Sequence, residues 1–199
     1  MSMGTRSWWR RKVTIAALAG AGLFSLGCSL TSDLVAYEDL PPEEARYTLE
    51  LDSGDAVTVW EYTSAHVDES TSVQPCMGAA LGDPSIGECR PEPLIFLRYD
   101  LGLDLEESVR ANRPHTFTVT GYYAPQLEEP PTVTQLTVEV SYDGGQTWQQ
   151  AQVQKQPDGS YRVTATHPKH ADEVSLRVSA SDSDGNTVVQ TLPEAFSVR

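Results

Sequence analysis

Apolar and polar side chains alternate along most of the chain from about residue 46 to its end. A period of two residues is typical of β-strands with one buried face, and here it predicts short strands throughout. No stretch of about ten or more residues in this part has the 3.6-residue period of a helix, so the expected fold class is all-β. The predicted strands cover residues 47–52, 56–62, 93–100, 115–123, 134–143, 147–155, 160–167, 173–182 and 186–193.

Turn sequences separate these strands. Residues 53–55 (Ser-Gly-Asp) predict a hairpin between the first two strands, and similar Asp/Gly turns lie at 143–145, 157–159 and 184–186. This regular spacing predicts an antiparallel sandwich of the immunoglobulin or fibronectin III type over residues 101–199, with a single helical turn left open within 101–114. Residues 46–100 are expected to form a smaller β module before it.

The first 28 residues have a different pattern. Four basic residues, Arg6, Arg10, Arg11 and Lys12, precede an apolar run that is too short to span a bilayer. Small residues and Cys28 follow, so residues 1–27 are expected to be a signal peptide. The Arg10-Arg11 pair also has a weak likeness to a twin-arginine export signal.

Residues 25–28 (Ser-Leu-Gly-Cys) partly match a bacterial lipobox, with the leucine one place later than usual. We expect the Cys28 thiol to carry the lipid anchor, at the outer face of the cytoplasmic membrane or the cell surface. The alternative is an ordinary cleaved signal peptide in which Cys28 has no role. Residues 28–45, which are acidic and contain two adjacent prolines, are then a tether.

The chain is strongly acidic. Its formal charge is −14, and removal of residues 1–27 takes away four of its 14 Lys and Arg and none of its 28 Asp and Glu, which leaves −18. Nucleic acid and anionic headgroups are bound through basic residues. The charge therefore argues against both as ligands.

Three cysteines are an odd number for an exported chain. With Cys28 as the anchor, Cys76 and Cys89 remain, and we expect them to form a disulfide in an oxidising compartment. The Gly- and Pro-rich segment between them would be closed at a gain of about 3 kcal/mol. Free thiols and a metal site are the alternatives, but a zinc site would need CxxC pairs and nearby histidines.

Residues 141–148 (SYDGGQTW) fit the Asp-box pattern of sialidases and related propellers. We expect Asp143 to accept backbone N–H bonds, Gly145 to adopt a left-handed conformation and Trp148 to pack back over the turn. Because the box occurs once and has no repeat period, it predicts a structural turn, not a propeller blade.

Asp182, Asp184 and Asn186 have the two-residue spacing of a calcium loop, but the Glu that an EF-hand needs is replaced by Thr191. A polar turn is expected, with weak calcium binding left open.

Histidine chemistry has little support in the sequence. His167 and His170 could share a metal only across Pro168, which disfavours the helical turn that would bring them together. His66 lacks a catalytic context, and motifs for catalysis or cofactors are absent from the sequence. We therefore expect neither enzymatic activity nor a cofactor.

Residues 57–68, 136–153 and 174–191 together resemble the C-terminal accessory region of secreted subtilisin-like serine peptidases of actinobacteria. The resemblance implies a non-catalytic immunoglobulin-like module. The catalytic Asp, His and Ser motifs of the peptidase domain have no counterpart in this chain, and the 76–89 excursion departs from the family pattern.

The expected function is that of a tethered binding or accessory module for an extracellular protein or an envelope polymer. The candidate contact points are Tyr122 and Tyr123 in the loop 121–131, and the loop between the cysteines. Ordinary packing at the end of a strand is the alternative role for the two tyrosines. The alternative functions are a hydrolase centred on His66 or His167, and a structural remnant of a peptidase tail.

Overall fold

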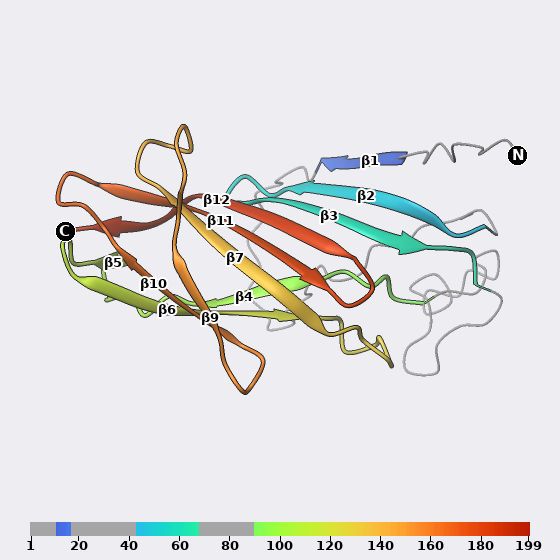
Figure 1. Ribbon diagram of the computed structural model, residues 1–199. Helices are drawn as coiled ribbons and strands as arrows, with labels where there is room; N and C mark the ends of the chain where they lie inside the picture. The colour runs from blue at the N-terminus through green and yellow to red at the C-terminus, as the bar shows by residue number, and fades with distance from the viewer. Residues whose placement is uncertain (1–10, 17–42, 68–89) are drawn as a thin grey trace, which may run out of the picture.

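The computed structural model describes residues 11–16, 43–67 and 90–199, and these residues form strands and no helix. The strands make two sheets that face each other as a sandwich (Figure 1). Their bounds are β1 (Arg11–Ala16), β2 (Ala45–Asp52), β3 (Val57–Ser64), β4 (Phe96–Asp100), β5 (Ser108–Val109), β6 (Pro114–Tyr122), β7 (Val133–Ser141), β8 (Gln149–Gln150), β9 (Gln152–Lys155), β10 (Tyr161–Thr166), β11 (Glu173–Asp182) and β12 (Thr187–Val198).

The larger sheet has eight strands in the order β1-β2-β3-β12-β11-β7-β8, with β5 paired to β12, and the smaller has four in the order β4-β6-β10-β9. All pairs are antiparallel except β1–β2 and β5–β12. The prediction of an all-β, antiparallel sandwich is confirmed at this level. Within the described residues, no helix is long and apolar enough to cross a membrane.

The core lies between the two sheets. Strand β3 alternates strictly between partly buried and buried residues, as the sequence pattern predicts. Val138 and Val178 of the larger sheet and Val119 and Val163 of the smaller sheet are fully buried. The indole N–H of Trp60 in β3 donates to the carbonyl of Ile95, at 2.8 Å, which links the larger sheet to the segment that leads into β4.

Residues 46–100, which the sequence predicts as a module of their own, supply strands to both sheets. The hairpin β2–β3 joins the larger sheet through pairing of β3 with β12, whereas β4 is the edge strand of the smaller sheet. The predicted hairpin turn is confirmed, with Gly54 at φ +86° and a bond of 3.0 Å from the Ser53 amide to the Ala56 carbonyl.

Strand β1, which belongs to the predicted signal peptide, pairs with β2 in parallel. The three cysteines, Cys28, Cys76 and Cys89, all lie outside the described residues, and so does most of the predicted tether.

The predicted strand 147–155 divides at Ala151. β8 pairs with β7 in the larger sheet, and β9 pairs with β10 in the smaller sheet. The Ala151 amide donates to the Val138 carbonyl at 2.8 Å, where the chain passes between the sheets. Such a crossing is the usual way in which a strand forms a corner of a sandwich.

The helical turn left open within 101–114 is absent. Instead, the Asp104 carboxylate accepts hydrogen bonds from the amides of Glu106 and Ser108, both at 3.0 Å, and β5 follows. Arg199 forms ion pairs with Asp104 and Glu106, so this segment fastens the C-terminus.

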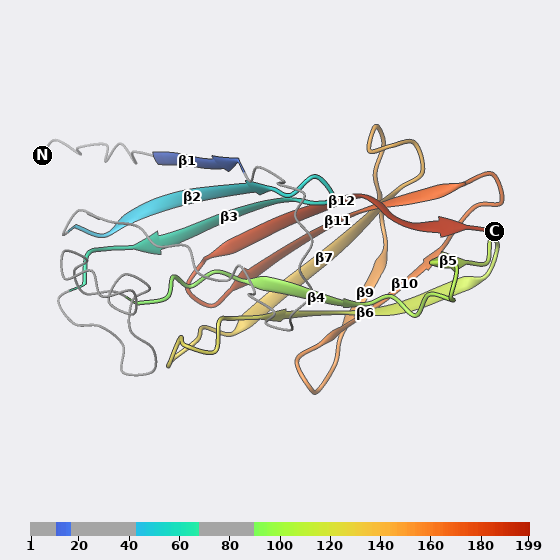
Figure 2. The ribbon, with the colours of Figure 1, turned by 180° about the vertical axis from the view of Figure 1, so that it is seen from behind.

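The two ends of the sandwich carry different loops, as the view from behind also shows (Figure 2). The C-terminus and β5 lie at one end, which we call the C-terminal end. At the other end β2 begins, β3 and β11 finish and β6 leads into its loop; we call this the Glu44 end.

Candidate functional site

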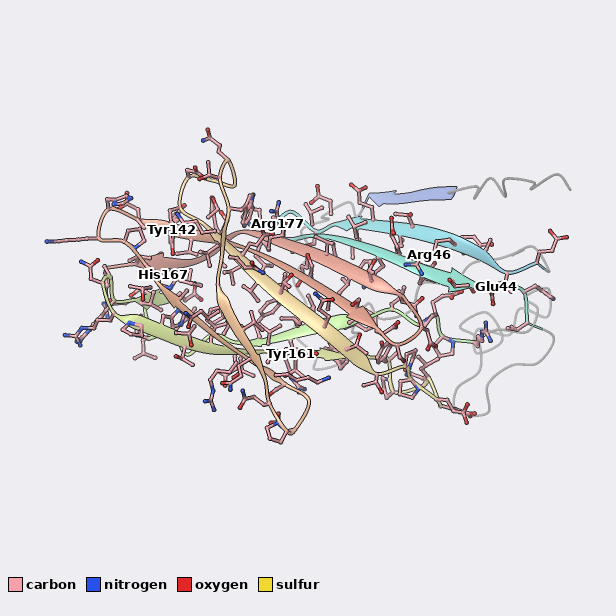
Figure 3. All side chains as sticks on the ribbon, in the orientation of Figure 1. Glu44, Arg46, Tyr142, Tyr161, His167 and Arg177 are labelled. Carbon is pink, nitrogen blue, oxygen red and sulfur yellow. The ribbon has the colours of Figure 1, made fainter. Side chains whose placement is uncertain are left out.

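Three segments from distant parts of the chain meet at the Glu44 end (Figure 3). They are residues 90–93, the loop after β6 and the turn between β11 and β12. Together with the start of β2 and the end of β3 they enclose a cleft of about 340 Å³, which we call the end cleft. Its lining residues are Glu44, Thr63, Arg90, Pro91, Pro93, Leu127, Glu129, Pro131, Asp184 and Asn186.

The end cleft is lined by both acidic and apolar side chains. Glu44, Glu129 and Asp184 contribute carboxylates, and Arg90 contributes the cationic side chain of the lining. Leu127 and three prolines supply apolar surface. Because proline fixes its own φ, this part of the wall is stiff before any ligand arrives.

Asp182 fixes the turn that forms one wall. Its side chain is 5% exposed, and its Oδ1 accepts hydrogen bonds from the amides of Asp184 at 2.9 Å and Asn186 at 2.8 Å. Its Oδ2 accepts from the Asn186 side-chain amide at 2.9 Å and from the Tyr123 hydroxyl at 2.8 Å. Protein donors therefore occupy both carboxylate oxygens.

The calcium alternative for this turn has no support in that geometry, because N–H and O–H groups surround Asp182 where a cation would need oxygen ligands. Among the described residues, no group of three or more His, Cys, Asp or Glu side chains could hold a metal ion. A polar turn explains the bonds from Asp184 and Asn186, and the bond from Tyr123 joins this turn to the loop after β6.

The turn is also tied to the first hairpin. The side-chain oxygen of Asn186 accepts a hydrogen bond from the Thr63 amide at 3.1 Å. The guanidinium of Arg46 donates to the Gly185 carbonyl at 2.7 Å. These bonds tie the turn between β11 and β12 to β2 and to the end of β3, and they fix this part of the cleft.

Tyr122 and Tyr123, the two predicted contact residues, have side chains in different environments. Tyr123 is partly buried, and burial together with the bond to Asp182 raises the pKa of its hydroxyl, so it stays a donor. Tyr122 is 36% exposed on the outer face of the smaller sheet, where the Arg98 guanidinium lies 5.8 Å from its ring centre. Neither lines the end cleft; their loop reaches it through Leu127, Glu129 and Pro131.

Glu92 was not singled out by the sequence, yet it is an unusual residue next to the cleft-lining prolines. Its Oε1 accepts a hydrogen bond from the Ser64 hydroxyl at 2.9 Å. Its Oε2 is buried without a hydrogen-bond partner, as is the Tyr47 hydroxyl among the described residues. Burial raises the pKa of Glu92, against the opposing effects of Ser64 and Arg90.

The Asp-box segment forms a compact turn on the larger sheet. Asp143 accepts hydrogen bonds from the Thr147 amide at 2.8 Å and the Thr147 hydroxyl at 2.6 Å, and from Ser141 at 2.8 Å. These bonds, that from the Thr147 hydroxyl foremost, lower the pKa of Asp143 to about 2. Gly145 has φ +84°, and Trp148 faces the Arg177 guanidinium at 4.4 Å. All of these contacts are within the turn and its sheet.

The four histidines lie in three places. His66 and His170 are exposed, whereas His167 is fully buried. His167 is therefore not paired with His170; its Nε2 lies 3.0 Å from Nδ1 of His115. A substrate would not reach the His167 ring in this conformation, which argues against a hydrolase centred there.

His115 was missed by the sequence analysis, although a signal for it existed. The alternation that places Phe117 and Val119 inward puts residue 115 on the same inward phase. The partner of an inward histidine depends on how the sheets face each other, which the alternation does not specify.

A scan against protein-family models found no match, and a search of curated proteins found none either.

Proposed function

We propose that this chain is a non-enzymatic lipoprotein, tethered at the outer face of the membrane or the cell surface, that acts as a binding or accessory module for an extracellular protein or envelope polymer. The proposal takes the sandwich as one of the immunoglobulin or fibronectin III type. The observation that carries it is the end cleft, where three distant segments enclose about 340 Å³. Loops held at one end of a rigid scaffold are a common location of recognition surfaces.

The chemistry of the lining favours a cationic partner. Carboxylates of Glu44, Glu129 and Asp184 outnumber the guanidinium of Arg90, and the whole chain carries a charge of −14. A lysine or arginine side chain, or a free amine of a polymer, would be attracted to such a cleft, whereas phosphate-rich ligands would be repelled. Leu127 and the prolines would contact the apolar part of the ligand.

The walls of the cleft are organised in advance, which favours binding. Asp182 and Asn186 lock one turn, and Arg46 fastens that turn to β2. Side chains and loops that are already ordered lose little conformational freedom on association. A ligand therefore meets a shaped surface and does not have to order it.

The position of the tether fits the same proposal. The chain enters β2 at Ala45, beside Glu44 of the cleft. Sixteen residues separate Cys28 from Ala45, and the seventeen steps from one Cα to the next reach about 60 Å at full extension. With Cys28 acylated, the end cleft would face the membrane and meet partners within that distance.

Site-specific photo-crosslinking in intact cells tests the cleft. A photoreactive residue at Leu127 should give a defined adduct, and one at exposed Arg162, on the outer face of the smaller sheet, should not. Glu129→Arg should reduce the Leu127 adduct by about tenfold, as expected for loss of about 1.4 kcal/mol of binding. Glu173→Arg, at the opposite end, is the matched control and should leave the adduct unchanged. Equal adducts from both positions, or none, would contradict the proposal.

Metabolic labelling with a palmitate analogue tests the anchor. The wild-type chain and a Cys76→Ala variant should both carry the label, because only Cys28 is proposed to be acylated. Cys28→Ala should lose it. Unchanged labelling of Cys28→Ala would end the lipoprotein proposal without affecting the end cleft.

A further inference from the structure

A continuous chain of hydrogen bonds runs through the C-terminal end of the sandwich. His115 Nε2 lies 2.7 Å from the Leu101 carbonyl, so this nitrogen must carry the proton and donate. His115 Nδ1 is then an acceptor, and His167 Nε2, at 3.0 Å, donates to it. His167 Nδ1 is left as an acceptor for the Tyr142 hydroxyl at 3.1 Å. This is the arrangement in which each ring carries one proton, on Nε2.

The chain joins the two sheets. His115 belongs to β6 and His167 directly follows β10, both in the smaller sheet, whereas Tyr142 directly follows β7 of the larger sheet. Phe196 of β12 packs against both imidazoles, with ring centres 5.2 Å from His115 and 5.3 Å from His167. Figure 3 shows Tyr142 and His167 side by side near the C-terminus, far from Glu44.

The surroundings offer no compensation for a positive charge. His167 is fully buried and His115 is 9% exposed. The groups that contact the pair are Phe117 of β6, Phe196 of β12, the Tyr142 hydroxyl and the Leu101 carbonyl, and among the described residues no carboxylate is bonded to either ring. The charged residues nearest along these segments, all at the surface, are Asp100, Arg113, Asp143, Lys169 and Glu194.

We infer that His115 and His167 form an acid-sensitive lock between the two sheets, which is closed when both rings are neutral and opens when the pair takes up protons. The inference rests on the geometry of the pair and is independent of the proposed ligand and anchor.

The first proton can enter at His167 Nδ1, which accepts the Tyr142 hydrogen bond in the neutral chain. His167 then still donates from Nε2 to His115 Nδ1 and now also donates from Nδ1 to the Tyr142 oxygen. The Tyr142 hydroxyl then turns toward the Thr166 carbonyl, 3.5 Å away. The result is a buried cation without a counter-ion, which is costly.

A second proton breaks the pair. With both rings charged, N–H groups face each other across the 3.0 Å gap and the two positive charges repel. The rings must separate. The Asn112 amide, which donates to the His167 carbonyl at 2.9 Å, would lose its partner as the end of the sandwich opens.

The direction of titration agrees with this inference. Burial, and after it the proximity of His115, lowers the pKa of His167 to about 4. An unfolded histidine has a pKa near 6.5, so between pH 6.5 and 4 the unfolded chain binds more protons than the folded one. Stability is therefore fully present above pH 6.5 and is lost as the pH falls toward 4.

Equilibrium unfolding of the full chain as a function of pH tests the lock. For the His167 shift alone, the folding equilibrium constant should fall about 20-fold between pH 7 and pH 5. His167→Gln, which stays neutral, should show a much flatter dependence over this range. His170→Gln removes an exposed histidine and should keep the 20-fold loss. Equal pH dependence of the wild type and His167→Gln would overturn the inference.

Nitrogen-15 NMR of the wild-type imidazoles covers the case in which His167→Gln does not fold. At pH 7 His167 should show the neutral form protonated at Nε2, and it should not titrate near pH 6.5 while the protein is folded. Hydrogen exchange at the Asn112 amide, corrected for the intrinsic rate, should lose protection at pH 5 before core amides do. Ordinary titration of His167 in the folded protein, with Asn112 still protected, would show that there is no lock.

Discussion

The Tyr123 hydroxyl donates a 2.8 Å hydrogen bond to Asp182 and so joins the loop after β6, in the smaller sheet, to the end of β11, in the larger one. Because Asp182 is almost fully buried, losing this donor would leave part of a buried carboxylate unsatisfied. The bond is the counterpart, at the Glu44 end, of the histidine chain at the C-terminal end.

Replacing Tyr123 by Phe should therefore destabilise the fold by about 1–3 kcal/mol. Tyr122→Phe is the matched control, because Tyr122 is the preceding residue and lies at the surface. This substitution should change the free energy of unfolding by less than about 0.5 kcal/mol. Urea denaturation of both variants measures the difference. Equal effects of the two substitutions would mean that the bond to Asp182 contributes nothing.

The Asp143 turn should contribute to stability only while its carboxylate is ionised. The folded-state pKa of Asp143, about 2, lies below the ordinary value of 3.8, so its contribution is present above pH 3.8 and is lost as the pH falls toward 2. Asp143→Asn should lower the melting temperature at pH 6 and have little effect at pH 2. Asp55→Asn, in the turn between β2 and β3, is the control.

Gly145 should tolerate substitution less well than Gly159. Both have positive φ, +84° and +85°, so a side chain is strained at either position. At Gly145 a Cβ atom would also lie 3.3 Å from the Trp148 ring, whereas at Gly159 it would meet nothing within 4 Å. Gly159→Ala should cost about 1 kcal/mol and Gly145→Ala more, as measured by chemical denaturation. The reverse order would show that Trp148 does not hold the turn.

Glu92→Gln should stabilise the protein at neutral pH. Burial raises the folded-state pKa of Glu92, so ionisation of this carboxyl destabilises the folded protein. The loss of stability develops as the pH rises from 4.5 through the folded-state pKa. The variant should therefore be more stable relative to wild type at pH 7 than at pH 4. Glu129→Gln, which removes an exposed carboxylate, is the control in the same unfolding experiment, and an equal result for the two variants would contradict a role for the burial of Glu92.

Local alternation was sufficient to predict most strands, because most inward positions in β3, β6, β7 and β11 are apolar, with Thr58, His115 and Asp182 among the polar exceptions. Alternation did not predict the strand bounds that depend on which distant strand each segment pairs with. The division at Ala151 depends on which sheet each half meets, and β12 extends beyond residue 193 although Pro193 and Glu194 interrupt the alternation. A register shift in its partner between Val174 and Leu176 accommodates this interruption.

The candidate site was predictable only in pieces. The sequence pointed separately to the loop 121–131, the excursion between the cysteines and the turn at 182–186. The excursion between the cysteines lies outside the described residues. The meeting of the loop 121–131 and the turn at 182–186 with residues 90–93 at the end cleft follows from the order β3-β12-β11 and from β4 pairing with β6, which no local pattern encodes. The partnership of His115 with His167 is likewise a property of two strands that are 52 positions apart.

The place where β2 begins has a mechanical consequence. The chain that precedes Glu44 joins the sandwich beside the end cleft, so a load between that chain and a molecule held in the cleft would follow a short path through the first hairpin and the 182–186 turn. Since β2 and β3 share eight consecutive residue pairs, a pull along β2 strains many hydrogen bonds in shear at the same time. The opposite end, with its buried imidazoles, would carry almost none of this force and could respond to acidity alone.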